Sequence, residues 1–99
     1  MKITTVKDKR IKTAIEAKDP AKAIKGWNAK ENATVREQIT AILAATHPLQ
    51  LNNPSWHVHE LKPGQPGVWS LRVTKNFRLT FRFDPATNTA SELSYLDYH

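Results

Sequence analysis

Hydrophobic and polar positions follow a helical period in the first half of the chain. In residues 8–17, Ile11, Ala14 and Ile15 are spaced i, i+3 and i+4, which predicts a short amphipathic helix. Asp8 is the expected N-cap, because its carboxylate can accept the unpaired amides of the first turn. A first strand is predicted just before it, in residues 3–6.

A longer helix is predicted from Asp19-Pro20 to about Ala45, because apolar residues keep helical spacing over this range. Aspartate suits the N-cap position and proline the first helical position. Gly26 and residues 28–32 weaken the middle of this helix. His47-Pro48 ends it, since the residue before a proline disfavours helical geometry.

The second half alternates with a period of two, which is typical of strands. Proline, glycine and asparagine mark turns at 63–67 and 84–88. The strands are expected at 56–61, 68–74, 77–83 and 89–98. Residues 1–99 are therefore predicted to form a single α+β domain. Two N-terminal helices pack on a mainly antiparallel twisted sheet of four to five strands.

The register of the hairpin around 68–83 follows from its apolar positions. A three-residue loop at 74–76 places Leu71 opposite Leu79 and Arg72 opposite Arg78. A two-residue loop would exchange the two faces of the sheet and lose the apolar match. Two arginines opposite one another repel. Arg72, Arg78 and Arg82 therefore belong either to a solvated outer face or to a site where a phosphate bridges the guanidinium groups.

Composition narrows the functional classes. The chain has 99 residues with 15 Lys and Arg against 9 Asp and Glu, a net charge of +6. This surplus favours a polyanionic partner, nucleic acid first and an anionic membrane second. The absence of cysteine excludes disulfides and thiolate chemistry. No apolar run approaches the ~18 residues of a membrane span, and the N-terminus lacks the apolar core of a signal peptide, so a cytoplasmic location is expected.

The aromatic and histidine residues leave several interpretations open. Trp27 and Trp69 are expected in the core, whereas Trp56 follows a loop and could stack on a base. His57 and His59 are two residues apart, which on a strand points both side chains the same way. Metal binding is disfavoured because no second ligand cluster has suitable spacing. Proton transfer by one histidine near the basic face is the alternative.

The run from Gly67 to Phe83, GVWSLRVTKNFRLTFRF, and the closing Asp97-Tyr98-His99 resemble the HigB toxins of the RelE/ParE superfamily of bacterial toxin–antitoxin systems. The resemblance implies a RelE-like microbial RNase fold. It also implies a ribosome-dependent mRNA endoribonuclease that works without metal or other cofactor, by attack of the RNA 2′-OH. The expected partners are the ribosome, mRNA and a HigA-like helix-turn-helix antitoxin.

Carried onto this chain, the resemblance implies catalytic and RNA-binding residues. The catalytic residues are His59, Arg78, Asp97, Tyr98 and His99, and the RNA-binding residues are Lys62, Arg72 and Arg82. The chain departs from many relatives at residues 63–66, where a basic residue is missing. The RNA contact of that loop is therefore in doubt.

Two other functions remain as alternatives at this point. One is a toxin of the same superfamily that inhibits DNA gyrase, like ParE, for which Asp97, Tyr98, His99 and His59 have no chemical use. The other is a small basic module that holds RNA without cutting it. A supercoiling assay separates the first from a nuclease, and intact RNA after incubation on translating ribosomes identifies the second.

Overall fold

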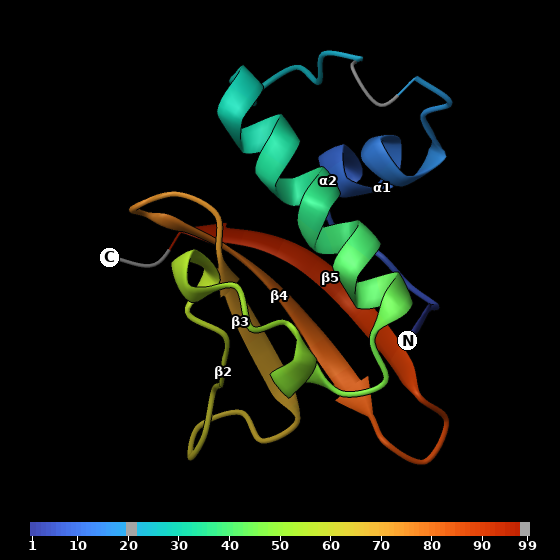
Figure 1. Cartoon of the computed structure of the whole chain (residues 1–99), viewed down its shortest axis with the longest axis vertical. Helices are drawn as coiled ribbons and strands as arrows, with labels where there is room; N and C mark the ends of the chain where they lie inside the picture. Colours follow the sequence, from blue (N-terminus) through green and yellow to red (C-terminus); the bar gives the residue numbers. More distant parts are fainter. Residues whose placement is uncertain (20–21, 98–99) are drawn as a thin grey trace.

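A computed structural model of the chain describes residues 1–19 and 22–97 (Figure 1). Its helical elements are α1 (Lys9–Glu16), α2 (Ala29–Ala44) and the short 3₁₀ turns η1 (Pro48–Gln50) and η2 (Pro54–Trp56). Its strands are β1 (Lys2–Ile3), β2 (His59–Glu60), β3 (Val68–Arg72), β4 (Phe77–Asp84) and β5 (Thr89–Asp97). The predicted α+β architecture is confirmed. Neither helix in the described ranges is long and apolar enough to cross a membrane.

Helix α1 begins where the sequence predicts. The Asp8 carboxylate accepts from the amides of Arg10 at 2.8 Å and Ile11 at 3.3 Å. These bonds satisfy donors that the first turn of a helix leaves unpaired. Ile11 and Ala14 are buried, as the apolar stripe predicts, whereas Ile15 stays 38% exposed.

The predicted start of the second helix at Asp19-Pro20 is wrong, since α2 begins only at Ala29. Described residues 22–28 are not helical, and in the turn at 25–26 Gly26 has a φ of 95°, a left-handed conformation that a helix cannot contain. Asn28 is the true N-cap: its side chain accepts from the Glu31 amide at 2.7 Å, and the Glu31 carboxylate accepts from the Asn28 amide at 3.1 Å. Pro20 itself lies outside the described residues.

The sheet has the strand order β1-β5-β4-β3-β2. Strands β2 to β5 pair antiparallel in sequence order, and β1 pairs parallel with β5. The predicted hairpin register is confirmed, with Leu71 opposite Leu79 and Arg72 opposite Arg78. Most of the predicted strand at 56–61 is not strand, because His57 has a φ of 47° and pairing is confined to His59 and Glu60.

The core lies between the helices and one face of the sheet. Leu71, Leu79 and Phe81 of that face are at most 1% exposed. They belong to one cluster with Ile11 of α1 and Ile42 of α2. All three tryptophans are 8% exposed, which confirms the prediction for Trp27 and Trp69 and makes Trp56 a core residue as well. Burying this face leaves the opposite face of the sheet, called the outer face below, for other contacts.

Candidate functional site

The outer face carries the paired arginines at its hairpin end. Ser70 and Thr80 lie on the same face and are almost fully buried. Arg78 Nη1 donates to Ser70 Oγ at 3.4 Å, and Arg72 Nε donates to the Thr74 carbonyl at 3.3 Å. Both described bonds go to neutral oxygens, so the positive charges of two opposed guanidinium groups remain available to an anion.

His59 is brought onto the same face as these arginines. His59 lies opposite Ser70 of β3, and Ser70 lies opposite Thr80 of β4. These three cross-strand partners form a row next to the row that contains Arg72 and Arg78. Neighbouring rows on one face are about 7 Å apart along a strand. The Nδ1 atom of His59 lies 2.9 Å from the His57 carbonyl oxygen. A carbonyl only accepts, so Nδ1 donates, and the neutral ring then carries its lone pair on Nε2.

Arg82 lies on the outer face but already contacts a carboxylate. Its Nε donates to Glu92 Oε2 at 3.1 Å, and Lys7 Nζ lies 3.3 Å from Glu92 Oε1. The hydrogen bond from Arg82, followed by the contact with Lys7, lowers the pKa of Glu92 below its ordinary value. Glu92 is therefore negatively charged at neutral pH and partly neutralises Arg82, whose side chain is still 53% exposed.

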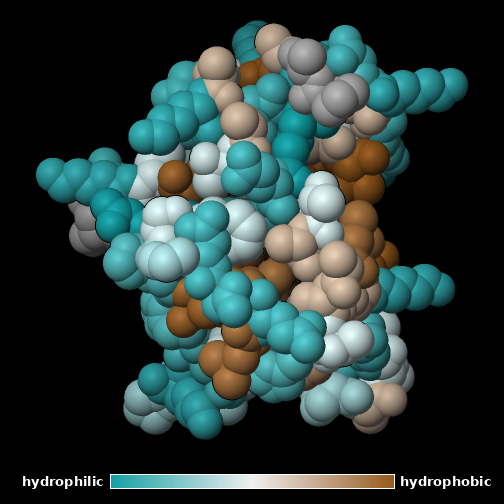
Figure 2. Space-filling view, in the orientation of Figure 1, coloured by the Kyte–Doolittle hydropathy of each residue, from teal (hydrophilic) through white to brown (hydrophobic). Residues whose placement is uncertain are grey.

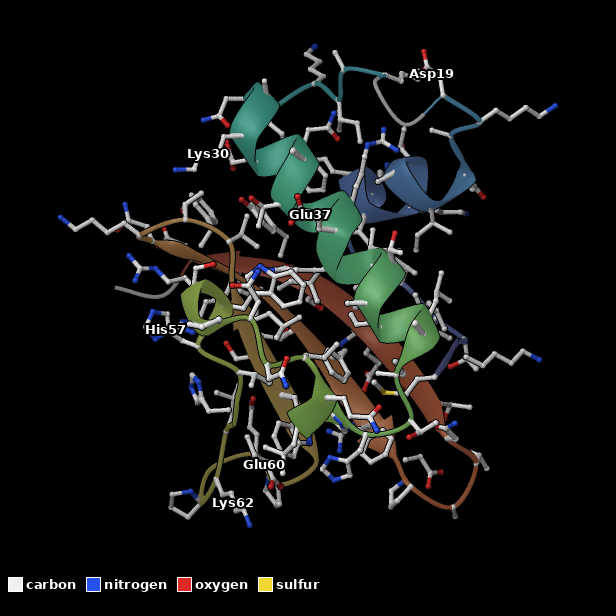
Figure 3. All side chains as sticks on the ribbon, in the orientation of Figure 1. Asp19, Lys30, Glu37, His57, Glu60 and Lys62 are labelled. Atoms are coloured by element: carbon white, nitrogen blue, oxygen red, sulfur yellow. The ribbon has the colours of Figure 1, made fainter. Side chains whose placement is uncertain are left out.

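Lys62 lies at the opposite end of the sheet from the Arg72–Arg78 pair, just beyond β2 (Figure 3). Its Nζ is 3.4 Å from Glu60 Oε1, and its side chain is 65% exposed. The Gly67 amide donates to Glu60 Oε2 at 2.8 Å, and this bond is the main reason that the pKa of Glu60 is lowered. The three expected RNA-binding residues thus extend along the sheet and do not form one cluster.

Asp97 ends β5 at the same end of the sheet as the paired arginines. It pairs with Phe77, and Leu96 pairs with Arg78. Because alternate residues of a strand face opposite ways, the outer-face position beside Arg78 belongs to Leu96, and Asp97 occupies the other face. The expected catalytic residues Tyr98 and His99 lie outside the described residues.

The end of β5 is fixed to the helices through Tyr95. The Tyr95 hydroxyl donates to Glu31 Oε2 at 2.5 Å, and its ring stacks on Phe77 with centroids 5.0 Å apart. The Arg10 guanidinium lies 4.9 Å from the Tyr95 ring centroid, a cation–π distance. Burial and then the bond to Glu31 raise the pKa of Tyr95 above its usual range, so the phenol stays protonated. These contacts position the strand that leads to Asp97.

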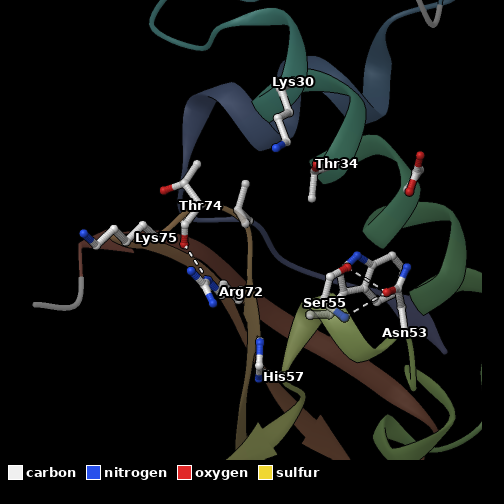
Figure 4. A pocket seen from close by; sticks show the side chains of 11 residues that line it. Lys30, Thr34, Asn53, Ser55, His57, Arg72, Thr74 and Lys75 are labelled. Atoms are coloured by element: carbon white, nitrogen blue, oxygen red, sulfur yellow. Dashed lines mark hydrogen bonds between the residues drawn. The ribbon is translucent and has the colours of Figure 1, made fainter.

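A pocket that sequence reasoning missed lies between α2, η2 and the β3–β4 hairpin (Figure 4). Its volume is about 310 Å³. Lining residues come from three separate parts of the chain: Lys30, Thr34 and Glu37; Asn53, Ser55, Trp56 and His57; and Arg72, Val73, Thr74 and Lys75. No local pattern signals such a pocket, because it exists only once α2 packs across the sheet. Glu92 was also missed, since its approach to Arg82 depends on the irregular register between Thr80 and Arg82.

Metal-ligating side chains do not gather in the described ranges. Within residues 1–19 and 22–97, no group of three or more His, Cys, Asp or Glu side chains is placed to hold a metal ion. His57 and His59 do not form the side-by-side pair expected of a regular strand, because the backbone of His57 is left-handed.

Two helices on one face of a mainly antiparallel five-stranded sheet are consistent with the fold of RelE-like toxins of type II toxin–antitoxin systems. Residues 4–99 match the family described as "RelE-like toxin of type II toxin-antitoxin system HigB", and the chain belongs to this family. It is also 35% identical over 74 residues to Endoribonuclease HigB of Proteus vulgaris, an alignment that covers 75% of this chain and 78% of that protein. The predicted family is confirmed, and membership implies an antitoxin partner.

Proposed function

We propose that this toxin is an endoribonuclease that cleaves mRNA on the ribosome without a catalytic metal ion. The observation that carries the proposal is the directly opposed Arg72–Arg78 pair on the outer face, where like charges repel unless an anion lies between them. The similarity to Endoribonuclease HigB supports the activity. A phosphodiester is the anion that an endoribonuclease must hold.

The proposed reaction uses the nucleophile that RNA itself carries. A base removes the proton of a ribose 2′-OH, and the 2′-oxygen attacks the adjacent phosphorus. The bond to the 5′-oxygen then breaks as an acid protonates that oxygen, which leaves a 2′,3′-cyclic phosphate and a 5′-OH. Positioned acid and base groups contribute about 100- to 10,000-fold each.

Each candidate residue has a role in this scheme. Arg78 stabilises the negative charge of the phosphorane, and Arg72, Lys62 and Arg82 hold neighbouring phosphates. His59 is suited to accept a proton through Nε2, because its Nδ1 donates to the His57 carbonyl. The remaining proton transfer and its orientation are assigned by the resemblance to Asp97, Tyr98 and His99.

The partners and location follow from the same proposal. A ribosome-dependent enzyme acts in the cytoplasm, where translation takes place. The antitoxin is proposed to be a HigA-like helix-turn-helix protein that neutralises the toxin.

The deciding experiment is primer extension on mRNA in a translating extract, together with chemical analysis of the new RNA ends. New stops that need ribosomes, with cyclic phosphate and 5′-OH ends, are expected. Arg78→Ala should lower the single-turnover rate about 100-fold or more, with ribosome binding little changed. Arg78→Lys keeps the charge but loses the planar fork of donors, so an intermediate rate is expected.

The alternatives give different outcomes. Ends with a 5′-phosphate contradict attack by the 2′-OH, and cutting of free mRNA contradicts ribosome dependence. Loss of negative supercoiling by gyrase, with RNA left intact, would identify a ParE-like inhibitor. Salt-sensitive RNA binding with no cleavage on translating ribosomes would identify a binding module.

A further inference from the structure

We propose that the pocket between α2, η2 and the β3–β4 hairpin binds one nucleotide of the RNA chain beside the cleaved linkage. The inference rests on the proposed function for the identity of the ligand, and on the pocket itself for its place and chemistry. The volume of about 310 Å³ is at the lower end of the range for small-molecule sites. It suits a single nucleotide better than a folded RNA element.

The charges around the pocket favour a phosphate. Lys30 points from α2 toward the hairpin, where Arg72 lies on the other side of the pocket (Figure 4). Lys75 also lines the pocket, but its side chain extends away from it. Glu37 is the one carboxylate among the described lining residues, so positive charge prevails. Lysine and arginine side chains on opposite walls can hold one phosphate between them.

The other walls offer what a sugar and base require. Trp56 and Val73 provide apolar surface. The Ser55 hydroxyl donates to Asn53 Oδ1 at 2.7 Å, so its oxygen keeps lone pairs that can accept a hydrogen bond. The Asn53 amide nitrogen and the Thr34 hydroxyl are further polar groups at the rim. A bare anion would need only the Lys30 and Arg72 side chains, whereas a nucleotide also uses the apolar and polar groups of the other walls.

Arg72 connects the pocket to the outer face. It lines the pocket and is also paired with Arg78. On the edge of β3 away from β4, strand β2 pairs with Trp69 and Ser70, and in the described part of the chain no strand pairs with that edge at Arg72. An RNA chain lying across the outer face can therefore bend around this open edge and place its next nucleotide in the pocket.

The test is an NMR titration of the full chain with a 2′-O-methyl RNA trinucleotide, which cannot be cleaved because its 2′-oxygen lacks a proton. The readout is the indole N–H signal of Trp56, with the signals of Trp27 and Trp69 as internal references. A saturable shift of the Trp56 signal is expected. Lys30→Ala should weaken binding about tenfold, the usual effect of losing one charge-assisted contact.

Lys2→Ala is the matched control, because it removes the same charge from β1 at the opposite edge of the sheet. It should change the affinity less than twofold once salt is held constant. Equal losses in the two variants, or binding that leaves the Trp56 signal unmoved, would overturn the proposal. Inorganic phosphate that binds as tightly as the trinucleotide would also overturn it, by reducing the pocket to an anion site. Ribosomes are absent from this titration, so failure of the cleavage assay and failure of the pocket are distinguishable.

Discussion

The two arginines that face each other across the β3–β4 pair repel one another and lower the stability of the fold. Arg72 and Arg78 are direct cross-strand partners, and like charges in this arrangement cost a few tenths to about 1 kcal/mol. Neither position needs arginine to form the strand, because the apolar register is set by Leu71 and Leu79 on the other face. Such a cost is expected where the charge serves binding or catalysis and not folding.

This cost can be measured by removing one charge. Arg72→Thr should leave the free energy of unfolding unchanged or raise it by up to about 1 kcal/mol, most clearly at low salt. The Gln38 side chain donates through Nε2 to the backbone carbonyl of residue 72 at 2.8 Å, and this bond does not depend on the arginine side chain, so the variant retains it. Urea denaturation at two salt concentrations checks this, with Lys75→Thr in the exposed hairpin loop as the control. A clear loss of stability on removing Arg72 contradicts the interpretation.

The charge of Asp8 stabilises the fold, in contrast to the charges of the arginine pair. Burial alone would raise its pKa, but hydrogen bonds from the Arg10 side chain and amide outweigh this and lower the pKa below 3.8. A carboxylate whose pKa is lower in the folded than in the unfolded state stabilises the protein fully at any pH above its unfolded-state pKa. This stabilisation is lost as the pH falls through the folded-state pKa.

Asp8→Ala is expected to lower the free energy of unfolding at pH 7 by about 1–2 kcal/mol, because it removes the N-cap of α1. Asp8→Asn keeps a capping oxygen but does not titrate. Its free energy of unfolding at pH 7 should fall less than that of Asp8→Ala, and it should lose less stability than the wild type below pH ~4. Thermal unfolding between pH 3 and 7 measures both the stability of each variant at pH 7 and its loss of stability with falling pH. Identical acid profiles for the wild type and Asp8→Asn would contradict the assigned role of this carboxylate.

Elements with strong local signals were predictable from sequence. The β3–β4 hairpin has alternation and turn chemistry that agree, and its register is as predicted. The start of α2 was predicted wrongly, because Asp19-Pro20 also has the residue types of a helix start. The left-handed Gly26 and the capping box of Asn28 and Glu31 place the start at Ala29 instead. The parallel pairing of β1 with β5 joins residues almost 90 positions apart, which no local pattern encodes.

The same limit applies to the candidate site. The face shared by Arg72, Arg78 and Ser70 follows from strand alternation, and it was predictable. The partner of Arg82 and the pocket beside Lys30 depend on how distant elements pack, so neither could be predicted from the sequence. The separation of Lys62 from the arginine pair could be seen only once the sheet was assembled.

Tyr95 connects elements and offers a test of how β5 is held. Tyr95→Phe removes the hydroxyl that donates to Glu31 but keeps the ring that stacks on Phe77. The free energy of unfolding should fall by about 1.5–3 kcal/mol, the usual range for a hydrogen bond to a charged group. Chemical denaturation measures this loss. Glu31→Gln is the paired control, and near-additive losses in the double variant would mean that the two groups do not interact.

At the scale of the whole molecule, charge is distributed unevenly. Residues 1–25 contain eight of the 15 basic residues and only three acidic ones. Hydrophilic residues cover most of the face shown in Figure 2, and hydrophobic residues show between them at the right edge and in the lower middle of the view. The basic stretch from Lys7 to Lys25 is remote in sequence from the hairpin and can bind ribosomal RNA through phosphate contacts that carry no sequence information.

Replacing three exposed lysines of this region tests that idea. The variant Lys9→Gln, Lys12→Gln and Lys22→Gln should bind ribosomes more weakly, and the slope of log affinity against log salt should fall by about 2–3. Binding is measured by sedimentation with ribosomes at several salt concentrations. The melting temperature should change little, because all three side chains are exposed. An unchanged slope would exclude this region from ribosome binding.

The position of β5 in the sheet bears on when the toxin becomes dangerous to the cell that makes it. Strand β5 lies between β1 and β4, so the first strand to be translated has no neighbour until residues 89–97 have emerged from the exit tunnel. Contacts between such distant segments form late and slowly. Because β5 also pairs with β4 at Arg78, the sheet that carries the two arginines is completed only when this last strand is in place.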